Sequence, residues 1–405
     1  MKKILLVALC SITTAWAQSG DEYVPKTQEQ KVAQPAATSP TTASPYKITF
    51  YGVLDAGMTV ADKIGTSNSS AVMYNSGAQD TSRMGITGTQ DLGSGRSAVF
   101  MVETQIATGP GTNGTSSSSG SVNTMWNRGS QVGLNDKEYG SLLFGRQRSL
   151  IYQTFNVMDA RGGKNFGSSL IFWADGSSFG GTSTAVTGLT TMTGSTHWSN
   201  AMRYDSPLFN GVTLSGMYVP GGYNDSDYGA RYALTANYTP FKELTVVTGY
   251  SKINSSAGLT QGQIALLGGR WTSGPSTFAA GYTSIKNPSI EGSKNSDFTL
   301  TSLSMKRKMS PAIDWHAGVY NLADNYNSAN GATMVSTSMD YYFAKQTYVY
   351  VGVSTMNNNG TSGFAPFGAS GGANINSLSS TQYPSRVTVA GQVQNAITIG
   401  LSTSF

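Results

Sequence analysis

The chain has 405 residues, of which 12% are charged, 48 are glycine and 21 are tyrosine, and its formal net charge is +5. This composition does not suit an ordinary cytosolic enzyme, and the densest basic run, Lys306-Arg307-Lys308, is too short to indicate nucleic-acid binding. The only cysteine is Cys10, which excludes a disulfide framework and a thiolate metal site in the rest of the chain.

The first residues have the order of an export signal. Two lysines precede an apolar stretch at 4–9, and Ala15-Trp16-Ala17 supplies small residues for cleavage. We therefore expect a signal peptide at 1–17. Residues 18–45 are rich in Pro, Thr, Ser and Gln and show no periodic pattern, so we expect a disordered extension there. After the signal, no apolar run reaches the roughly 18 residues that a membrane-spanning helix needs.

From Lys47 onward, apolar and polar residues alternate. Ile48, Phe50 and Leu54 fall on one parity, whereas Thr49 and Asp55 fall on the other. Successive side chains of a strand point to opposite faces, so this pattern predicts a half-buried strand of about a dozen residues. The same pattern recurs at 230–238, 335–343 and 397–405. Two segments alternate less well: 297–309, and 347–355, where Tyr348 and Tyr350 occupy the parity opposite the valines.

Short and long connections take turns along the chain. Seven short turn-like segments lie at 91–95, 135–140, 207–211, 240–243, 273–275, 310–311 and 343–346, and eight long polar segments lie at 62–81, 108–124, 148–199, 220–227, 253–260, 286–297, 322–331 and 357–392. Together they predict about sixteen antiparallel strands. Their length, their bracketing by Tyr and Phe and the terminal Phe405 favour an all-β transmembrane barrel at 46–405 over a soluble sandwich. A barrel in lipid must close, because an open sheet edge would leave backbone groups unsatisfied.

Several motifs carry a family resemblance, in order along the chain. They are Lys47 to Thr59, Ser82-Arg83-Met84-Gly85-Ile86-Thr87-Gly88, Asn127-Arg128, Phe144-Gly145-Arg146-Gln147, Arg203-Tyr204-Asp205-Ser206-Pro207 and Gly400 to Phe405. This series resembles the Gram-negative porins of the neisserial and betaproteobacterial type. The sequence departs from the family pattern in its long extension before Pro45, in Met84, where the family usually has a larger residue, and in the length of 148–199.

The resemblance implies a multi-pass β-barrel in the outer membrane, with short periplasmic turns, long external loops and a third loop that folds inward and narrows the pore. It implies a homotrimeric, water-filled channel for passive diffusion of small hydrophilic solutes and ions. Lipid and lipopolysaccharide would surround this barrel, Phe405 would be recognised by the outer-membrane assembly machinery, and the 18–45 extension would lie in the periplasm.

Strand parity selects the candidate pore residues. Outward Met84 and Ile86 place Arg83 inside, and outward Phe100 and Val102 place Glu103 inside. The resemblance implies that matching arginines form a basic wall at the constriction, for which the candidates are Arg83, Arg128, Arg146 and Arg203, with Arg231 on the same face. The third loop contains Asp159 as an acidic pore-lining candidate, alongside Arg161 and Lys164. Basic candidates outnumber acidic ones, which predicts a mild preference for anions.

No catalytic, cofactor or metal constellation is recognisable. His197 and His316 are the only histidines, and neither has a ligand neighbour at metal-binding spacing, so we expect exposed or interfacial histidines. An outer-membrane lipase or protease would need a catalytic set that we do not find. Two alternatives to a general pore stay open: a substrate-selective uptake channel, and a structural or adhesin barrel with a blocked lumen.

Overall fold

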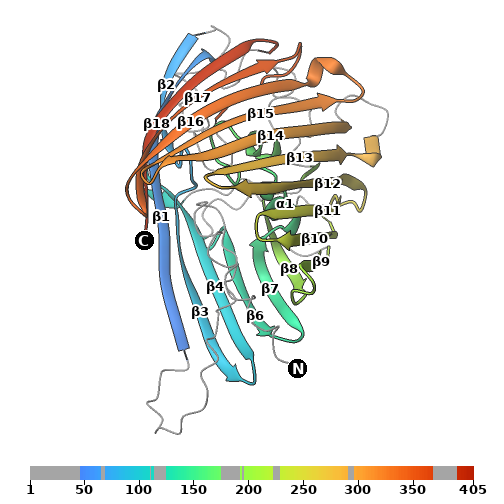
Figure 1. Ribbon diagram of the computed structural model, residues 1–405. Helices are drawn as coiled ribbons and strands as arrows, with labels where there is room; N and C mark the ends of the chain where they lie inside the picture. Colours follow the sequence, from blue (N-terminus) through green and yellow to red (C-terminus); the bar gives the residue numbers. More distant parts are fainter. Residues whose placement is uncertain are drawn as a thin grey trace, which may run out of the picture.

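The computed structural model describes residues 46–64, 69–109, 111–113, 125–174, 192–193, 196–221, 229–290, 296–367 and 390–405. Most of them form strands of one curved antiparallel sheet (Figure 1). The first strand, β1 (Tyr46–Ile64), pairs with the last, β18 (Val393–Ser404), from Val53 opposite Ser404 to Ala61 opposite Ala396. This pairing closes the sheet into a barrel, as lipid surroundings require. The predicted signal and extension, 1–45, lie outside the described residues.

The remaining strands follow one another around the barrel, each pairing with its neighbour in sequence except where noted below. They are β2 (Ser69–Ser76), β3 (Arg83–Gly93), β4 (Arg96–Ala107), β5 (Thr112–Asn113), β6 (Gly129–Asp136), β7 (Gly140–Arg148), β8 (His197–Asp205), β9 (Val212–Val219), β10 (Arg231–Phe241), β11 (Leu244–Asn254), β12 (Thr260–Ser273), β13 (Ser276–Lys286), β14 (Asp297–Ser310), β15 (Ile313–Asp324), β16 (Ala332–Ala344) and β17 (Thr347–Asn358). Two 3-10 turns, η1 (Pro288–Ile290) and η2 (Ser328–Asn330), lie in connections.

Strands β2 and β3 act as one interrupted barrel strand. Both pair with β1, with Ser76 opposite Ala56 and Arg83 opposite Val53, and residues 77–82 interrupt them. The two-residue β5 pairs only with the last residues of β4 and is not a separate strand of the wall, because the rest of β4 pairs with β6. Counted in this way, the wall has sixteen antiparallel strands, so the predicted architecture is confirmed. The expectation of one long loop at 62–81 is wrong, because a strand lies inside it and residues 77–82 are buried in the barrel rather than placed in a polar external loop.

All seven predicted short turns join consecutive strands. The connection between β8 and β9 illustrates the turn chemistry, since Asn210 and Gly211 have φ values of 47° and 82°, which glycine and asparagine tolerate best. The short turns therefore lie at one end of the barrel, called here the turn end, and the long connections lie at the other, called the loop end. Aromatic pairs such as Trp271 with Phe278, ring centroids 5.9 Å apart, lie on the outer face near the turn end.

Exposure follows the predicted parity. Ile48, Leu303 and Ile399 are 70%, 63% and 61% exposed, whereas the inward Asp55 and Thr398 are fully buried. The outside of the barrel is therefore apolar, as a lipid-facing wall must be. Among the described residues, no helix is long and apolar enough to cross a membrane.

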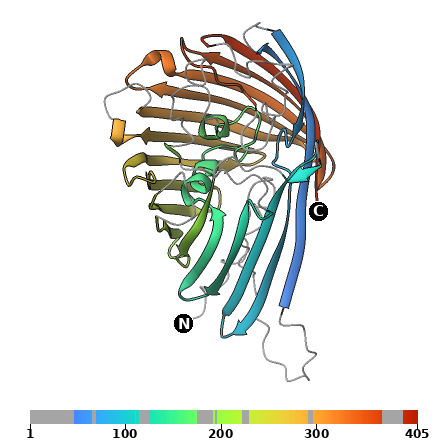
Figure 2. The ribbon, with the colours of Figure 1, turned by 180° about the vertical axis from the view of Figure 1, so that it is seen from behind.

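The first part of the third long connection, residues 149–174, lies inside the barrel (Figures 1 and 2). It contains the helix α1 (Leu150–Val157) and the short helix α2 (Leu170–Ala174). Ser149 caps α1, because its hydroxyl accepts a hydrogen bond from the backbone N–H of Tyr152 at 3.3 Å. Helix α1 contacts β9 to β12, and residues 150–173 are almost all buried, so this segment fills part of the interior.

Candidate functional site

The best-defined charged cluster lies on the inner wall, where β3, β4 and β6 meet. Glu103 stands between two arginines: its Oε1 lies 2.7 Å from Nε of Arg128, and its Oε2 lies 3.7 Å from Nε of Arg83. The hydroxyl of Tyr51, on β1, donates to Oε2 at 2.9 Å. The alternation of four neighbouring segments therefore directs these side chains to one place inside the barrel.

The side chains of Arg83, Glu103 and Arg128 are buried away from bulk water. Arg83, Glu103 and Arg128 are 7%, 5% and 4% exposed. Buried charges are tolerated when they are paired and hydrogen-bonded, and one carboxylate here faces two guanidinium groups. The trio therefore keeps a net positive charge.

A small cavity of about 30 Å³ lies beside this trio. Most of its lining residues are of polar or charged types, and they come from β4, β7, β8, α1 and the segment 128–131 at the start of β6: Met101, Glu103, Arg128, Gln131, Leu143, Gln147, Arg148, Gln153, His197 and Arg203. His197 is 4% exposed here, so the expectation of an exposed loop histidine is wrong. The reason is that His197 begins β8, opposite Arg148 of β7, and thus belongs to the barrel wall.

The structure distributes the other predicted arginines differently. Arg203 lines the cavity and binds Asp205 on its own strand at 2.9 Å, while its Nη1 donates to Gln153 of α1 at 3.3 Å. Arg231 also faces inward and lies 5.4 Å from the ring centre of Trp198. The predicted set is thus brought together only in part.

Arg146 does not line the cavity. It shares the parity of outward Leu142 and Phe144, beside an irregularity in the β7–β8 register, and donates to the carbonyl of Asn127 and to the hydroxyl of Ser199, both at 2.6 Å. The inner-wall assignment of Arg146 came from the family resemblance, whereas parity alone groups this residue with Leu142 and Phe144.

Asp159 is fully buried and stabilises its own segment. Its Oδ1 accepts the N–H of Arg161 at 2.8 Å, and its Oδ2 accepts the N–H and the hydroxyl of Ser169 at 3.1 and 3.0 Å. Its backbone carbonyl accepts Nη2 of Arg270, on β12, at 2.7 Å. The carboxylate therefore shapes the loop and makes no contact with the arginines of β3 to β8.

A second polar cluster, missed by the sequence, anchors the inserted segment. Lys164 Nζ lies 2.6 Å from Oδ1 of Asp80, and the hydroxyl of Tyr348 donates to Oδ2 at 2.6 Å. Burial opposes ionisation of Asp80, but the charge of Lys164 and the hydrogen bonds from Lys164 and Tyr348 outweigh it and lower the pKa of this carboxyl. Asp80 thus remains a buried anion that holds the loop.

The cluster continues to β15 and β16. Gln79 accepts Nη2 of Arg161 at 2.8 Å and donates to Oδ1 of Asp340 at 3.0 Å, while Nε2 of His316 lies 3.0 Å from Oδ2 of the same aspartate. His316 is only 3% exposed, so the expectation of an interfacial histidine is wrong. Its parity is inward, and Trp315, its neighbour in sequence, takes the outward position.

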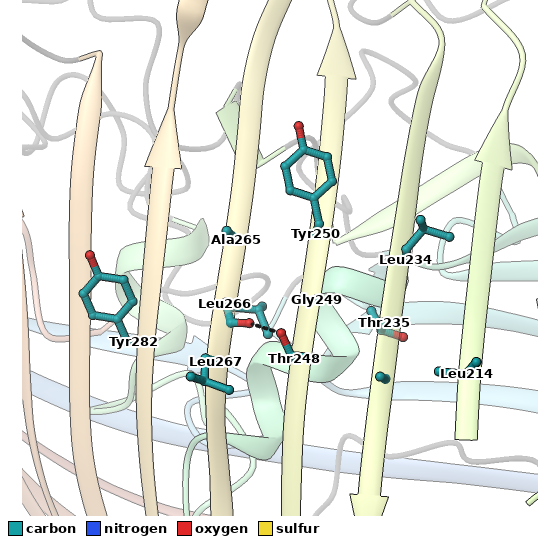
Figure 3. Close-up of a pocket in the computed structure, with 11 residues that line it drawn as sticks. Leu214, Leu234, Thr235, Thr248, Gly249, Tyr250, Ala265, Leu266, Leu267 and Tyr282 are labelled. Atoms are coloured by element: carbon teal, nitrogen blue, oxygen red, sulfur yellow. Dashed lines mark hydrogen bonds between the residues drawn. The ribbon is translucent and has the colours of Figure 1, made fainter. Parts of the chain in front are cut away.

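A larger groove, of about 600 Å³, lies on the outer wall across β9 to β13 (Figure 3). Small residues form part of its floor and larger apolar side chains flank it, among them the exposed Leu234, Tyr250, Leu267 and Tyr282. This groove lies on the lipid-facing side and contributes nothing to the interior. Across the part of the chain that the structure describes, there is no group of three or more His, Cys, Asp or Glu side chains that could hold a metal ion.

The closed sixteen-stranded wall, apolar outside and bearing a basic cluster within, defines a transmembrane β-barrel of the porin class. The chain matches the Gram-negative porin family over residues 8–361 and belongs to that family. This membership, with the multi-strand barrel, places the protein in the outer membrane of a Gram-negative bacterium.

Similar proteins support the assignment. The chain is 27% identical over 250 residues to an outer membrane porin protein of Bordetella pertussis, covering 59% of this chain and 54% of that protein. It is 29% identical over 195 residues to the major outer membrane protein P.IB of Neisseria gonorrhoeae, covering 47% and 48%. The chain thus spans about half the length of the curated relatives it matches.

Solved structures share the fold. The anion-selective porin from Comamonas acidovorans superimposes with a TM-score of 0.71 at 18% identity, covering 89% of this chain and all of that one. OmpT of Vibrio cholerae gives a TM-score of 0.60 at 15% identity, covering 90% and 98%. At these identities the likeness concerns the fold alone.

Proposed function

We propose that the protein is an outer-membrane porin that lets small hydrophilic solutes and ions diffuse passively, with a mild preference for anions. The observation that carries the proposal is the inner-wall cluster of β3 to β8, where Arg83, Arg128, Arg148 and Arg203 outnumber the carboxylates of Glu103 and Asp205. Fixed charges that line a narrow passage favour ions of opposite sign. Catalysis plays no part in this function.

Planar-bilayer recording tests the proposal. Purified protein should give discrete current steps that rise linearly with voltage, and the reversal potential in a KCl gradient should indicate chloride preference. Silent bilayers containing folded protein would instead indicate a structural or adhesin barrel, and a reversal potential of the opposite sign would reject the anion preference.

A substrate-selective uptake channel is the second candidate, and the hydrogen-bond donors that line the inner cavity favour it. A passage beside a 30 Å³ cavity, lined by Gln131, Gln147 and Gln153 as well as arginines, offers amide and guanidinium donors to a carboxylate-bearing solute. Selectivity would appear as conductance that one organic anion blocks at saturating concentration, whereas a general pore would show no saturation.

We propose further that the protein assembles as a homotrimer among lipid and lipopolysaccharide, and that Phe405 is read by the outer-membrane assembly machinery. The trimeric form of Vibrio cholerae OmpT is a structure of the same fold. Phe405 closes the β1–β18 seam, with its N–H and C=O bonded to Gly52 and its ring 5.5 Å from Phe50. Gel mobility before and after heating tests the trimer, and the yield of folded Phe405→Ala protein in outer membranes tests the signal.

A further inference from the structure

The inner wall is polar only in part. Toward the loop end, β9 to β17 direct apolar side chains into the barrel, and these are at most 3% exposed: Val219, Ile253, Ile264, Ile285, Phe298, Leu322, Met334 and Met356. A water column against such a surface would hydrate all of it. Instead these side chains belong to one buried apolar cluster, so something covers them.

The cover consists of two segments from distant parts of the chain. The first is 150–173, which contributes Ile151, Phe155, Phe172 and Trp173 to the cluster. Its fit to the wall depends on small residues there: a Cβ added to Gly268 would lie 2.5 Å from the sulfur of Met158, and one added to Gly281 would lie 2.7 Å from its Cβ. The wall therefore has room for this segment and little room for water beneath it.

The second segment is 358–367, which begins at the end of β17 and folds inward. Asn358 shapes it, because its side-chain amide donates to the carbonyl of Phe364 at 3.0 Å and its Oδ1 accepts the N–H of Phe364 at 2.8 Å. Thr361 ties the same segment to the neighbouring connection, since its N–H donates to the carbonyl of Ala329 at 2.9 Å. Hydrogen bonds within the segment and to the neighbouring connection therefore fix the conformation of 358–367.

The two segments pack against each other. The rings of Phe172 and Phe364 meet edge to face with centroids 5.3 Å apart, and both side chains are fully buried. Phe166 and Phe367 form an antiparallel bridge, and the N–H of Gly167 donates to the carbonyl of Pro366 at 2.9 Å. Apolar and backbone contacts therefore join what are separate loops in sequence.

We propose that 150–173 and 358–367 form a dry seal over the β9–β17 side of the lumen, so that the passage for water and solutes is one-sided. It runs along the arginine wall of β3 to β8, where the polar cavity lies. The seal itself follows from the packing; the statement about the passage rests on the proposed channel function. The two inserted segments together set the width of the pore. Because they cover the β9–β17 side, the arginine wall of β3 to β8 remains as the surface that selects ions.

Cysteine accessibility tests the seal without relying on ion flow, because Cys10, within the predicted signal, is the only native cysteine. Met334→Cys and Phe364→Cys report on the seal, Gln131→Cys on the proposed passage, and Thr89→Cys, on the exposed inner face of β3, is the matched control. A small charged methanethiosulfonate should label Met334→Cys and Phe364→Cys roughly tenfold or more slowly than Thr89→Cys, since a close-packed interior excludes it. Gln131→Cys should react at a rate close to that of the control.

The outcomes separate the seal from the function. Labelling of Met334→Cys as fast as that of Thr89→Cys would overturn the seal, and slow labelling of Gln131→Cys would overturn the one-sided passage, while a conducting wild type would leave the channel function intact. A second measurement guards against misfolding: Phe364→Ser should raise single-channel conductance about twofold or more by admitting water, whereas Leu259→Ser, in an exposed connection, should not. Unchanged conductance of Phe364→Ser protein that keeps its heat-modifiable gel mobility would also reject the seal.

Discussion

Lys164 and Asp80 form a buried ion pair, with 2.6 Å between Nζ and Oδ1, although 84 residues separate them in sequence. Asp80 lies in the interruption between β2 and β3, and Lys164 lies in the segment that crosses the barrel. Tyr348 of β17 completes the contact. One ion pair thus fastens the inserted segment to the wall near the seam where the first and last strands meet.

Replacing Lys164 with methionine should leave Asp80 as an uncompensated buried charge. We expect a loss of about 3–5 kcal/mol in the free energy of unfolding, as for other buried pairs that lose one partner. Denaturant unfolding of detergent-solubilised protein measures it. The control is Lys242→Met. Lys242 pairs with Glu243, and because their side chains are 71% and 40% exposed, this ion pair should contribute less than about 1 kcal/mol. The double variant Lys164→Met/Asp80→Asn should recover part of the loss; an equal or greater loss would contradict the pairing argument.

The Lys164–Asp80 pair also predicts that the folded protein loses stability at low pH. The pKa of Asp80 is lowered from its ordinary value of 3.8 in the folded protein, so its contribution to stability is present above that value and is lost as pH falls through the folded pKa. The midpoint of unfolding should therefore decline below about pH 4. The double variant, which lacks both charges, should show a smaller decline over the same range, and parallel declines for the two proteins would show that Asp80 contributes nothing.

Neutralising the inner-wall charges should move ion selectivity in opposite directions. Arg128→Gln should lower the chloride-to-potassium permeability ratio and Glu103→Gln should raise it. One unit charge changes the free energy of an ion 4 Å away in water by about 1 kcal/mol, roughly fivefold in the permeability of that ion, with opposite sign for chloride and potassium. Reversal potentials measure both. Arg96→Gln, at the exposed turn end, is the control and should have no effect. Equal chloride-to-potassium permeability ratios in all three variants would show that the Arg83–Glu103–Arg128 cluster does not determine ion selectivity.

An arginine on the outer wall should destabilise the barrel according to its depth in the membrane. Leu303 lies near the middle of β14 and Leu208 lies in the β8–β9 turn, and each is 63% exposed. Leu303→Arg should cost about 2–4 kcal/mol and Leu208→Arg about 0–1 kcal/mol. Unfolding of protein reconstituted in lipid vesicles distinguishes them. Equal costs would contradict the lipid-facing placement of Leu303.

Much of this architecture could be predicted because a strand has a period of two. Alternation placed Ile48 and Ile399 on one face and Asp55 and Thr398 on the other, and strand length, the Tyr and Phe bracketing and Phe405 indicated that the apolar face is the outer one. The turn residues located all seven short connections. The weakly alternating segment at 297–309 now has a reason. Phe298 and Leu300 face inward beneath the inserted loop, whereas Thr299 and Thr301 lie on the opposite parity, so the usual apolar-outside pattern is reversed at this end of β14.

The positions of several polar side chains depended on contacts with distant residues, which the two-residue period of a strand cannot specify. Tyr348 and Tyr350 interrupt the pattern of β17 because they face inward and donate to Asp80 and Asp55. Parity also could not show the register irregularity beside Arg146, or that Asp159 would bind Ser169 of its own loop.

The sequence by itself determined the wall: which face of each strand meets lipid, where each turn lies and how many strands close the barrel. These properties depend on residues a few positions apart, because alternation and turn chemistry are local. Only the tertiary structure decided what fills the lumen. Phe172 beside Phe364 and Lys164 beside Asp80 are brought together by closure of the whole ring, and no local pattern encodes which distant side chains will then meet.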